Sequence, residues 1–171
     1  HTLEHTILAY LYAAETPASM TEVARTTSGK RTLTQDFKTC FTRLLHDNVI
    51  SKNDKKNYSL NPTAPLYIGN LQQHPRGFGF VVGISSYHNA KKLEKDIHIA
   101  ANNLGGSVHG DRVLVRVHDP KNTSRPEGSV ITVLERGPDT ITGFLVHERR
   151  RSVIHPEDIR YPFIIEVDQA S

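Results

Sequence analysis

The chain has 171 residues, enough for one ordinary domain or for two or three small ones. Its longest apolar stretch, residues 7–14, is far too short to span a bilayer, and the first residues lack the features of a secretory signal. The single cysteine, Cys40, excludes an internal disulfide and argues against a structural zinc site. It therefore favours a reducing compartment, and we expect a cytoplasmic protein without membrane contact.

The net charge of +3 is unevenly distributed along the chain. Residues 1–62 hold 8 Lys and Arg against 6 Asp and Glu, residues 63–136 hold 9 against 6, and residues 137–171 hold 4 against 6. A basic front and an acidic end suit a nucleic-acid binder, although the same pattern fits many unrelated proteins.

Helical spacing dominates the first sixty residues. Apolar residues recur every three or four positions over about residues 2–14 and predict a helix. Capping pairs that begin at Ser19 and Thr32 predict two more helices, and residues 49–60 have the pattern of a hairpin. Three helices followed by a hairpin are the layout of a winged helix, a helix-turn-helix variant. Residues 1–62 are predicted to form this domain.

The third predicted helix is the element that could enter a DNA major groove. It offers only Lys38 and Arg43 as cations, and five residues apart these side chains point in different directions. A contact with DNA, a loose contact with RNA and a contact with protein therefore remain alternatives for this domain.

After a linker with two prolines, the apolar pattern changes from helical to strand-like. Five short strands with turn signals between them predict a small Greek-key barrel in residues 63–136. These strands are expected at residues 66–72, 77–82, 96–99, 113–117 and 129–134. The pattern begins again after residue 140, and residues 137–171 are predicted to form the truncated start of a second such barrel. Its three strands are expected at residues 141–146, 152–154 and 163–165. The fold class is α+β with several domains.

The segment from Arg76 to Val81, RGFGFV, carries the main functional signal. Residues two apart share one face of a strand, so Phe78 and Phe80 are expected on one side, with glycines that leave the space around the rings open. Bases of a single strand stack on such rings, worth roughly 1–3 kcal/mol each, and the cation holds phosphate. The alternative is that both rings belong to the core.

A second strand, with the sequence DIHI, is expected beside the phenylalanines. Ile97 and Ile99 would point inward, and His98 would point outward next to the rings. Two further groups of cations are candidates for the edge of this surface. They are Arg112 and Arg116, whose face the sequence leaves open, and the loop lysines Lys91, Lys92 and Lys95, which either track phosphate or are only solvated.

Together these motifs resemble the paired ribonucleoprotein motifs of cold-shock domains. Their order resembles the N-terminal half of the ribonuclease R and ribonuclease II exoribonuclease family, and a winged helix before the barrel is typical of ribonuclease R. The resemblance spans nearly the whole chain and adds His74 to the candidate nucleic-acid-binding residues. The matching pieces are Gly69, residues 74–80, residues 96–99, residues 109–113, Glu127-Gly128, residues 134–136, Thr142-Gly143 and residues 153–165.

The resemblance implies the RNA-feeding part of a processive 3′→5′ exoribonuclease, with single-stranded or structured RNA as the partner. That family's catalytic domain holds magnesium with clustered aspartates, and these 171 residues offer no such cluster. We therefore expect no catalytic residue, metal site or cofactor in this chain. One departure concerns His98, because cold-shock motifs usually carry phenylalanine there.

Two other functions compete with this interpretation. The chain could be a free-standing nucleic-acid-binding protein, either a regulator that reads DNA through the winged helix or an RNA chaperone. An incomplete second barrel argues against it, because that barrel would leave open sheet edges. Alternatively, both small domains could serve as docking surfaces for proteins, which a loss of RNA binding on mutation of the aromatic face would contradict.

Overall fold

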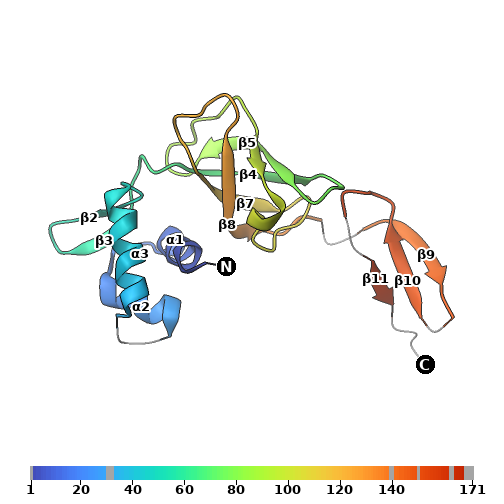
Figure 1. Ribbon diagram of the computed structural model, residues 1–171, viewed down its shortest axis with the longest axis horizontal. Coiled ribbons are helices and arrows are strands. Elements are labelled where there is room, and N and C mark those ends of the chain that lie inside the picture. Colours follow the sequence, from blue (N-terminus) through green and yellow to red (C-terminus); the bar gives the residue numbers. More distant parts are fainter. Residues whose placement is uncertain (1, 30–32, 139–140, 150, 162–163, 168–171) are drawn as a thin grey trace.

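The computed structural model describes residues 2–29, 33–138, 141–149, 151–161 and 164–167. Three parts follow one another along the chain, as Figure 1 shows: a helical unit with a small sheet, a closed barrel, and a three-stranded sheet. Among the helices described, none combines the length and the apolar character that crossing a membrane requires.

The helical unit contains the three helices and the hairpin that the sequence pattern indicates. Its helices are α1 (Leu3–Ala13), α2 (Met20–Ser28) and α3 (Gln35–His46). Its strands are β1 (Ala18–Ser19), β2 (Ile50–Lys52) and β3 (Asn57–Leu60), which form an antiparallel sheet in the order β1-β3-β2. The apolar faces of the helices bury Leu8, Phe37 and Phe41 against this sheet and against one another.

Hydroxyl side chains cap the N-termini of the second and third helices. The Oγ of Ser19 accepts a hydrogen bond from the amide of Glu22 at 3.2 Å, so the predicted start of α2 is confirmed. The cap of α3 is Thr34, whose Oγ1 accepts from the amide of Phe37 at 3.3 Å, while the predicted cap, Thr32, lies outside the described residues. In both helices the hydroxyl pairs an amide that has no partner within the helix.

The predicted barrel is present and closed. Its strands are β4 (Leu66–Gln73), β5 (Gly79–Ser86), β6 (Ile97–Ile99), β7 (Arg112–Val117) and β8 (Glu127–Glu135). They are paired in the order β4-β5-β6-β8-β7, and only β6 and β8 run parallel among these neighbours. Inward side chains from every strand fill the interior, together with Leu104 from the connection between β6 and β7: Leu71, Val81, Ile84, Ile97, Ile99, Val113, Val115, Val117 and Val130.

A second apolar cluster lies between the helical unit and the outside of the barrel. Along β7, Val113 and Val115 face the barrel interior, whereas Leu114 between them faces the helical unit. Leu66 of β4 and Ile131 of β8 join Leu114 on this outer surface, where α1 packs beside β8. The two parts therefore share a buried core, which the sequence analysis did not predict.

A network of ion pairs lies beside this shared core. Arg116 of β7 projects outward and donates from Nη1 to Oε1 of Glu4 in α1, and its Nη2 lies 3.7 Å from Oδ2 of Asp47. The second carboxylate oxygen of Glu4 lies 2.7 Å from Nη2 of Arg43 in α3. The side chain of Arg116 is only 18% exposed. The positive charge of Arg116 therefore stabilises the contact between the helical unit and the barrel.

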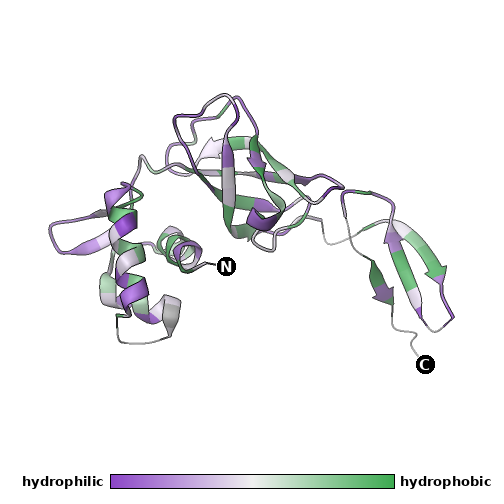
Figure 2. Cartoon of the chain, viewed as in Figure 1, coloured by the Kyte–Doolittle hydropathy of each residue, from purple (hydrophilic) through white to green (hydrophobic). Residues whose placement is uncertain are grey.

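The third part is an antiparallel sheet of β9 (Gly143–His147), β10 (Ser152–Pro156) and β11 (Ile165–Val167), in the order β11-β10-β9. It matches the predicted number of strands, although Phe163 of the predicted third strand lies outside the described residues. Figure 2 shows apolar residues along β9 and β10. Val153 of β10 is buried, but Phe144, Leu145 and Val146 of β9 are all exposed, so this sheet buries fewer of its apolar side chains than the barrel does.

Polar contacts hold the segment that follows β8, and a ring contact joins the barrel to the third part. The carboxylate of Asp111 is buried and accepts hydrogen bonds from the amide of Gly137 at 2.9 Å and from Nη1 of Arg136 at 2.8 Å. The ring of His109 meets the ring of Tyr161 edge to face, with centroids 5.3 Å apart. This attachment contrasts with the apolar core that joins the helical unit to the barrel.

Candidate nucleic-acid interface

Four aromatic side chains meet on the outside of the barrel. They are His74, Phe78, Phe80 and His98, and we call them the aromatic cluster. Phe80 lies on β5 directly between Gln72 of β4 and His98 of β6. Alternation along β5 and β6 turns Val81, Ile97 and Ile99 inward, so Phe80 and His98 point outward as the sequence pattern indicates.

The rings of the cluster touch in several orientations. His74 stacks on Phe78 with centroids 4.4 Å apart and planes 9° from parallel. Phe80 meets His98 at 5.5 Å and Phe78 at 5.8 Å, both edge to face. Phe78 is half-buried because His74 covers one of its faces, whereas Phe80 is 39% exposed. Phe80 and the outer side of His74 are therefore the most exposed ring surfaces of the cluster, and Phe78 and His98 keep part of their surface accessible.

A tight turn places Phe78 and presents Arg76. The strand β5 begins at Gly79 rather than at the predicted Gly77, so Phe78 lies in the turn before it. The amide of His74 donates to the carbonyl of Phe78 at 2.7 Å, and the amide of Gly77 donates to the carbonyl of His74 at 2.8 Å. Gly77 takes a φ of +98°, which favours glycine. This turn leaves Arg76 exposed at its tip, next to the aromatic cluster.

The role predicted for Gly79 is wrong. We expected the glycines of RGFGFV to leave free space around the rings, but Gly79 faces the crowded interior of the barrel. A Cβ at this position would lie 2.9 Å from Cδ1 of Leu71 and 3.1 Å from the carbonyl oxygen of Gln72. Gly79 is needed because β4 and β5 approach closely there, and the rings are accessible because no other described segment covers them.

A cleft of about 390 Å³ borders the aromatic cluster, and we call it the aromatic cleft. Phe80 and His98 form one wall, and Arg125 and Pro126 of the loop before β8 form the other. Lys95 also lines it, and its Nζ donates to the carbonyl of Ser124 at 3.3 Å. The carboxylates of two further lining residues, Asp96 and Glu127, leave the cleft with mixed rather than purely positive charge.

Arg125 was missed by the sequence analysis. It reaches the cleft because β8 pairs in parallel with β6, which puts Glu127 opposite His98 although 29 residues separate them. No local motif marks this pairing. The signal that could have found it is the Greek-key connection itself, since a closed barrel of five strands needs its third strand to meet its fifth.

The two arginines of β7 have different surroundings. Arg112 is exposed on the outer face of the barrel, but Asn70 and Gln72 of β4 lie between it and Phe80. The expectation that Arg116 edges the aromatic surface is wrong, because Glu4 and Asp47 hold its side chain under the helical unit. Of the predicted site residues, the structure thus brings together His74, Arg76, Phe78, Phe80, Lys95 and His98.

Among the described residues, no group of three or more His, Cys, Asp or Glu side chains is placed to hold a metal ion. Cys40 of α3 is a free, half-buried thiol, and burial raises its pKa above the ordinary value. A raised pKa keeps a thiol protonated and unreactive near neutral pH. The aromatic cluster and the cations beside it offer ring faces for stacking and positive charge for contact with phosphate.

Comparison with known proteins matches most of the barrel to a described family. Residues 69–133 match the family of the ribonuclease B OB domain. Ribonuclease R of Acidithiobacillus ferrooxidans is 28% identical over 116 residues, which are 68% of this chain and 25% of the relative. Ribonuclease R of Chlamydia pneumoniae is 38% identical over 77 residues, which are 44% of this chain and 11% of the relative. The chain thus spans a quarter or less of the curated relatives that it matches.

A solved structure, described as yeast Ssd1, a pseudonuclease, aligns with 60% of this chain and 17% of its own, at 17% identity and a TM-score of 0.43. The segment that matches the family of the OB domain begins in β4 and ends in β8, and so includes all four rings of the aromatic cluster. The resemblance of this chain to the N-terminal region of the ribonuclease R family is confirmed, and residues 69–133 of its barrel match the ribonuclease B OB domain.

Proposed function

We propose that this chain is the RNA-binding region of a ribonuclease R-like 3′→5′ exoribonuclease of the cytoplasm. In this proposal the helical unit is a winged helix that helps to capture RNA. The barrel guides a single strand toward a catalytic domain that is not among these residues, and the magnesium of the reaction belongs to that domain. The sheet β9–β11 is proposed to belong to a second cold-shock domain.

The aromatic cluster is the observation that carries this proposal. Burying a phenylalanine side chain is worth about 1.5–3 kcal/mol, so a protein gains little stability from leaving Phe80 exposed on a barrel strand. Four rings in contact on one surface provide faces and edges on which bases of any kind can stack. Stacking of this kind favours single-stranded nucleic acid with little sequence preference.

The charges around the cluster agree with a strand that lies across it. Arg76 stands at one side of the cluster, and Lys95 and Arg125 line the aromatic cleft at the other. These cations can contact phosphates on both sides of the stacked bases. Asp96 and Glu127 repel phosphate, and we therefore expect the backbone to follow the cations rather than the centre of the cleft.

Fluorescence anisotropy of a labelled single-stranded RNA tests the proposal. The double variant Phe78→Ala/Phe80→Ala is expected to lose about 2–4 kcal/mol of binding free energy if bases stack on these rings. Phe144→Ala is the matched control, because it makes the same exchange at a side chain 65% exposed on β9, away from the cluster. Unchanged binding by the double variant contradicts the proposed site.

The alternative of a DNA-reading regulator is less well supported by α3. Its exposed face offers Lys38 and the polar side chains of Thr39 and Thr42, but the second cation of the helix, Arg43, is paired with Glu4. A recognition helix normally supplies several contacts to phosphates and base edges. Tight, sequence-dependent binding of duplex DNA that Lys38→Ala abolishes would favour the regulator instead.

We further predict that the chain alone does not degrade RNA. Purified protein incubated with magnesium and an end-labelled single strand should leave the RNA at full length. Shortening of the RNA that persists through repeated purification, and that follows the protein across a sizing column, would place a nuclease site within these residues.

A further inference from the structure

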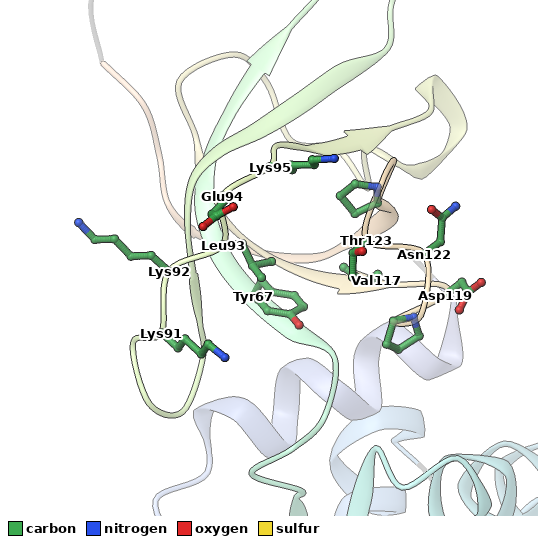
Figure 3. A pocket seen from close by; sticks show the side chains of 12 residues that line it. Tyr67, Lys91, Lys92, Leu93, Glu94, Lys95, Val117, Asp119, Asn122 and Thr123 are labelled. Atoms are coloured by element: carbon green, nitrogen blue, oxygen red, sulfur yellow. The ribbon is translucent and has the colours of Figure 1, made fainter.

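A second cleft, of about 370 Å³, lies at the end of the barrel between residues 91–95 and residues 119–126, and we call it the barrel-mouth cleft. Figure 3 shows the ring of Tyr67 between these two loops. Tyr67, Leu93 and Val117 line the cleft with apolar surface, and the first two also pack against the barrel core. An apolar floor in the mouth of a barrel is a common setting for a ligand.

Polar and charged groups surround this floor. Lys91, Lys92 and Lys95 line the cleft together with the carboxylates of Glu94 and Asp119, so the lysines outnumber the acids. In Figure 3 the ammonium group of Lys92 points away from the Tyr67 ring. Asn122 and Thr123 add neutral groups that can form hydrogen bonds with the edge of a base. A flat apolar floor with hydrogen-bonding and cationic edges suits a nucleotide better than a purely apolar ligand.

The barrel-mouth cleft borders the aromatic cleft. Lys95 and Pro126 line both, and the hydrogen bond from Lys95 to Ser124 joins the two loops where the clefts meet. A strand that leaves Phe80 along the aromatic cleft therefore passes Lys95 and arrives at Tyr67. The shared lining residues argue for one strand that occupies both clefts rather than for two separate ligands.

We propose that the barrel-mouth cleft receives a base of the same RNA strand whose neighbouring bases stack on the aromatic cluster, with Lys95 contacting the phosphate between them. This inference rests on the proposed function, and it adds a second anchoring point at Tyr67. Two anchoring points on one barrel fix the path of the strand from Phe80 to the end of the barrel.

Binding of short and long RNA to the variant Tyr67→Leu tests this path. Leucine retains apolar packing against the core but removes the ring. An RNA of about 10 nucleotides can reach both clefts, whereas one of about 4 nucleotides is held at the aromatic cluster. Tyr67→Leu should weaken binding of the long RNA about fivefold or more and leave the short RNA unchanged. Tyr10→Leu, on α1 and lining neither cleft, is the matched control.

Crosslinking of the unmodified chain provides an independent test that does not depend on the folding of a variant. RNA with 5-iodouridine at one position at a time is irradiated with the protein, and the crosslinked residue is identified by mass spectrometry. One position is expected to crosslink to Tyr67, and a position on one side of it to Phe80, Phe78 or a histidine of the cluster.

The outcomes separate the two proposals. Loss of RNA binding in Phe80→Ala, with no effect of Tyr67→Leu and crosslinks confined to the aromatic cluster, overturns the second anchoring point and leaves the proposed function intact. Binding that Phe80→Ala does not alter, with crosslinks outside the barrel, overturns both.

Discussion

Two outer surfaces of the barrel carry apolar side chains. The helical unit covers one of these surfaces, and the other is exposed. On β7 and β8, Leu114 and Ile131 are covered by the helical unit and are 0% and 1% exposed. On β5, Phe80 is 39% exposed, and the rings next to it are His74, Phe78 and His98. The covered surface stabilises the arrangement of the two parts, whereas the uncovered surface is available to a ligand.

The cations beside the two surfaces follow the same division. Arg116 lies at the covered surface and is paired with Glu4 and Asp47. Lys95 lies at the uncovered surface, where its hydrogen-bond partner is the backbone carbonyl of Ser124 rather than a carboxylate. A cation whose charge is already paired has little to offer a phosphate. Whether a cation is paired with a carboxylate therefore indicates its role better than its position in the sequence does.

The largest expected effect is on stability, at the covered surface. Leu114→Ala removes a fully buried side chain from the core shared by the barrel and the helical unit, and it should lower the free energy of unfolding by about 2–5 kcal/mol. Urea denaturation measures this change. Because Leu114 is far from the ligand in this account, the folded variant should bind RNA with unchanged affinity. If Leu114→Ala lowered the free energy of unfolding less than Phe80→Ala does, the covered surface would not be the one that stabilises the fold.

A smaller effect is expected in the salt dependence of RNA binding. Each phosphate contact on a single strand contributes about 0.7 to the slope of log K against log salt. Lys95→Gln should therefore reduce the slope by about 0.7, while Arg116→Gln, the same kind of exchange at the covered surface, should leave it unchanged. Anisotropy titrations at several salt concentrations give both slopes. A reduced slope for Arg116→Gln would mean that the helical unit moves away to expose it.

The smallest expected effect is the pH dependence of stability that comes from His109, whose ring contacts the third part. Burial lowers the pKa of His109, with Arg160 acting in the same direction and Asp158 opposing it. The Nδ1 of His109 accepts a hydrogen bond from the amide of Gln73 at 3.2 Å, which requires this nitrogen to be unprotonated. Since the unfolded chain takes up the proton more readily, the stability that this group provides is complete above a pH of about 6.5 and falls as the pH drops below it.

Thermal unfolding at pH 7 and pH 5 checks this expectation. His109→Asn keeps an acceptor but cannot titrate, so its melting temperature should fall less between these two pH values than that of the unmodified chain. The pKa of His5 is also lowered, chiefly by burial, and this group contributes equally in both proteins. Identical losses in the two proteins would show that His109 does not contribute.

Local patterns predicted much of this arrangement, and long-range pairing explains most of what they missed. The alternation around Val81 and Ile97 was enough to orient Phe80 and His98 outward. The apolar run of β7 did not reveal that Leu114 faces a different core from Val113 and Val115, because a strand buried on both sides has no alternating pattern. Arg125 and the pairing of Arg116 with Glu4 likewise depend on segments that are distant in sequence.

Nuclear magnetic resonance of the labelled chain during titration with single-stranded RNA tests the central claim most directly. The account predicts that the ring signals of His74, Phe78, Phe80 and His98 shift as RNA is added, while the methyl signals of Leu114 and Ile131, in the core between the barrel and the helical unit, remain in place. Shifts concentrated on α3, with the rings of the aromatic cluster unaffected, would contradict it.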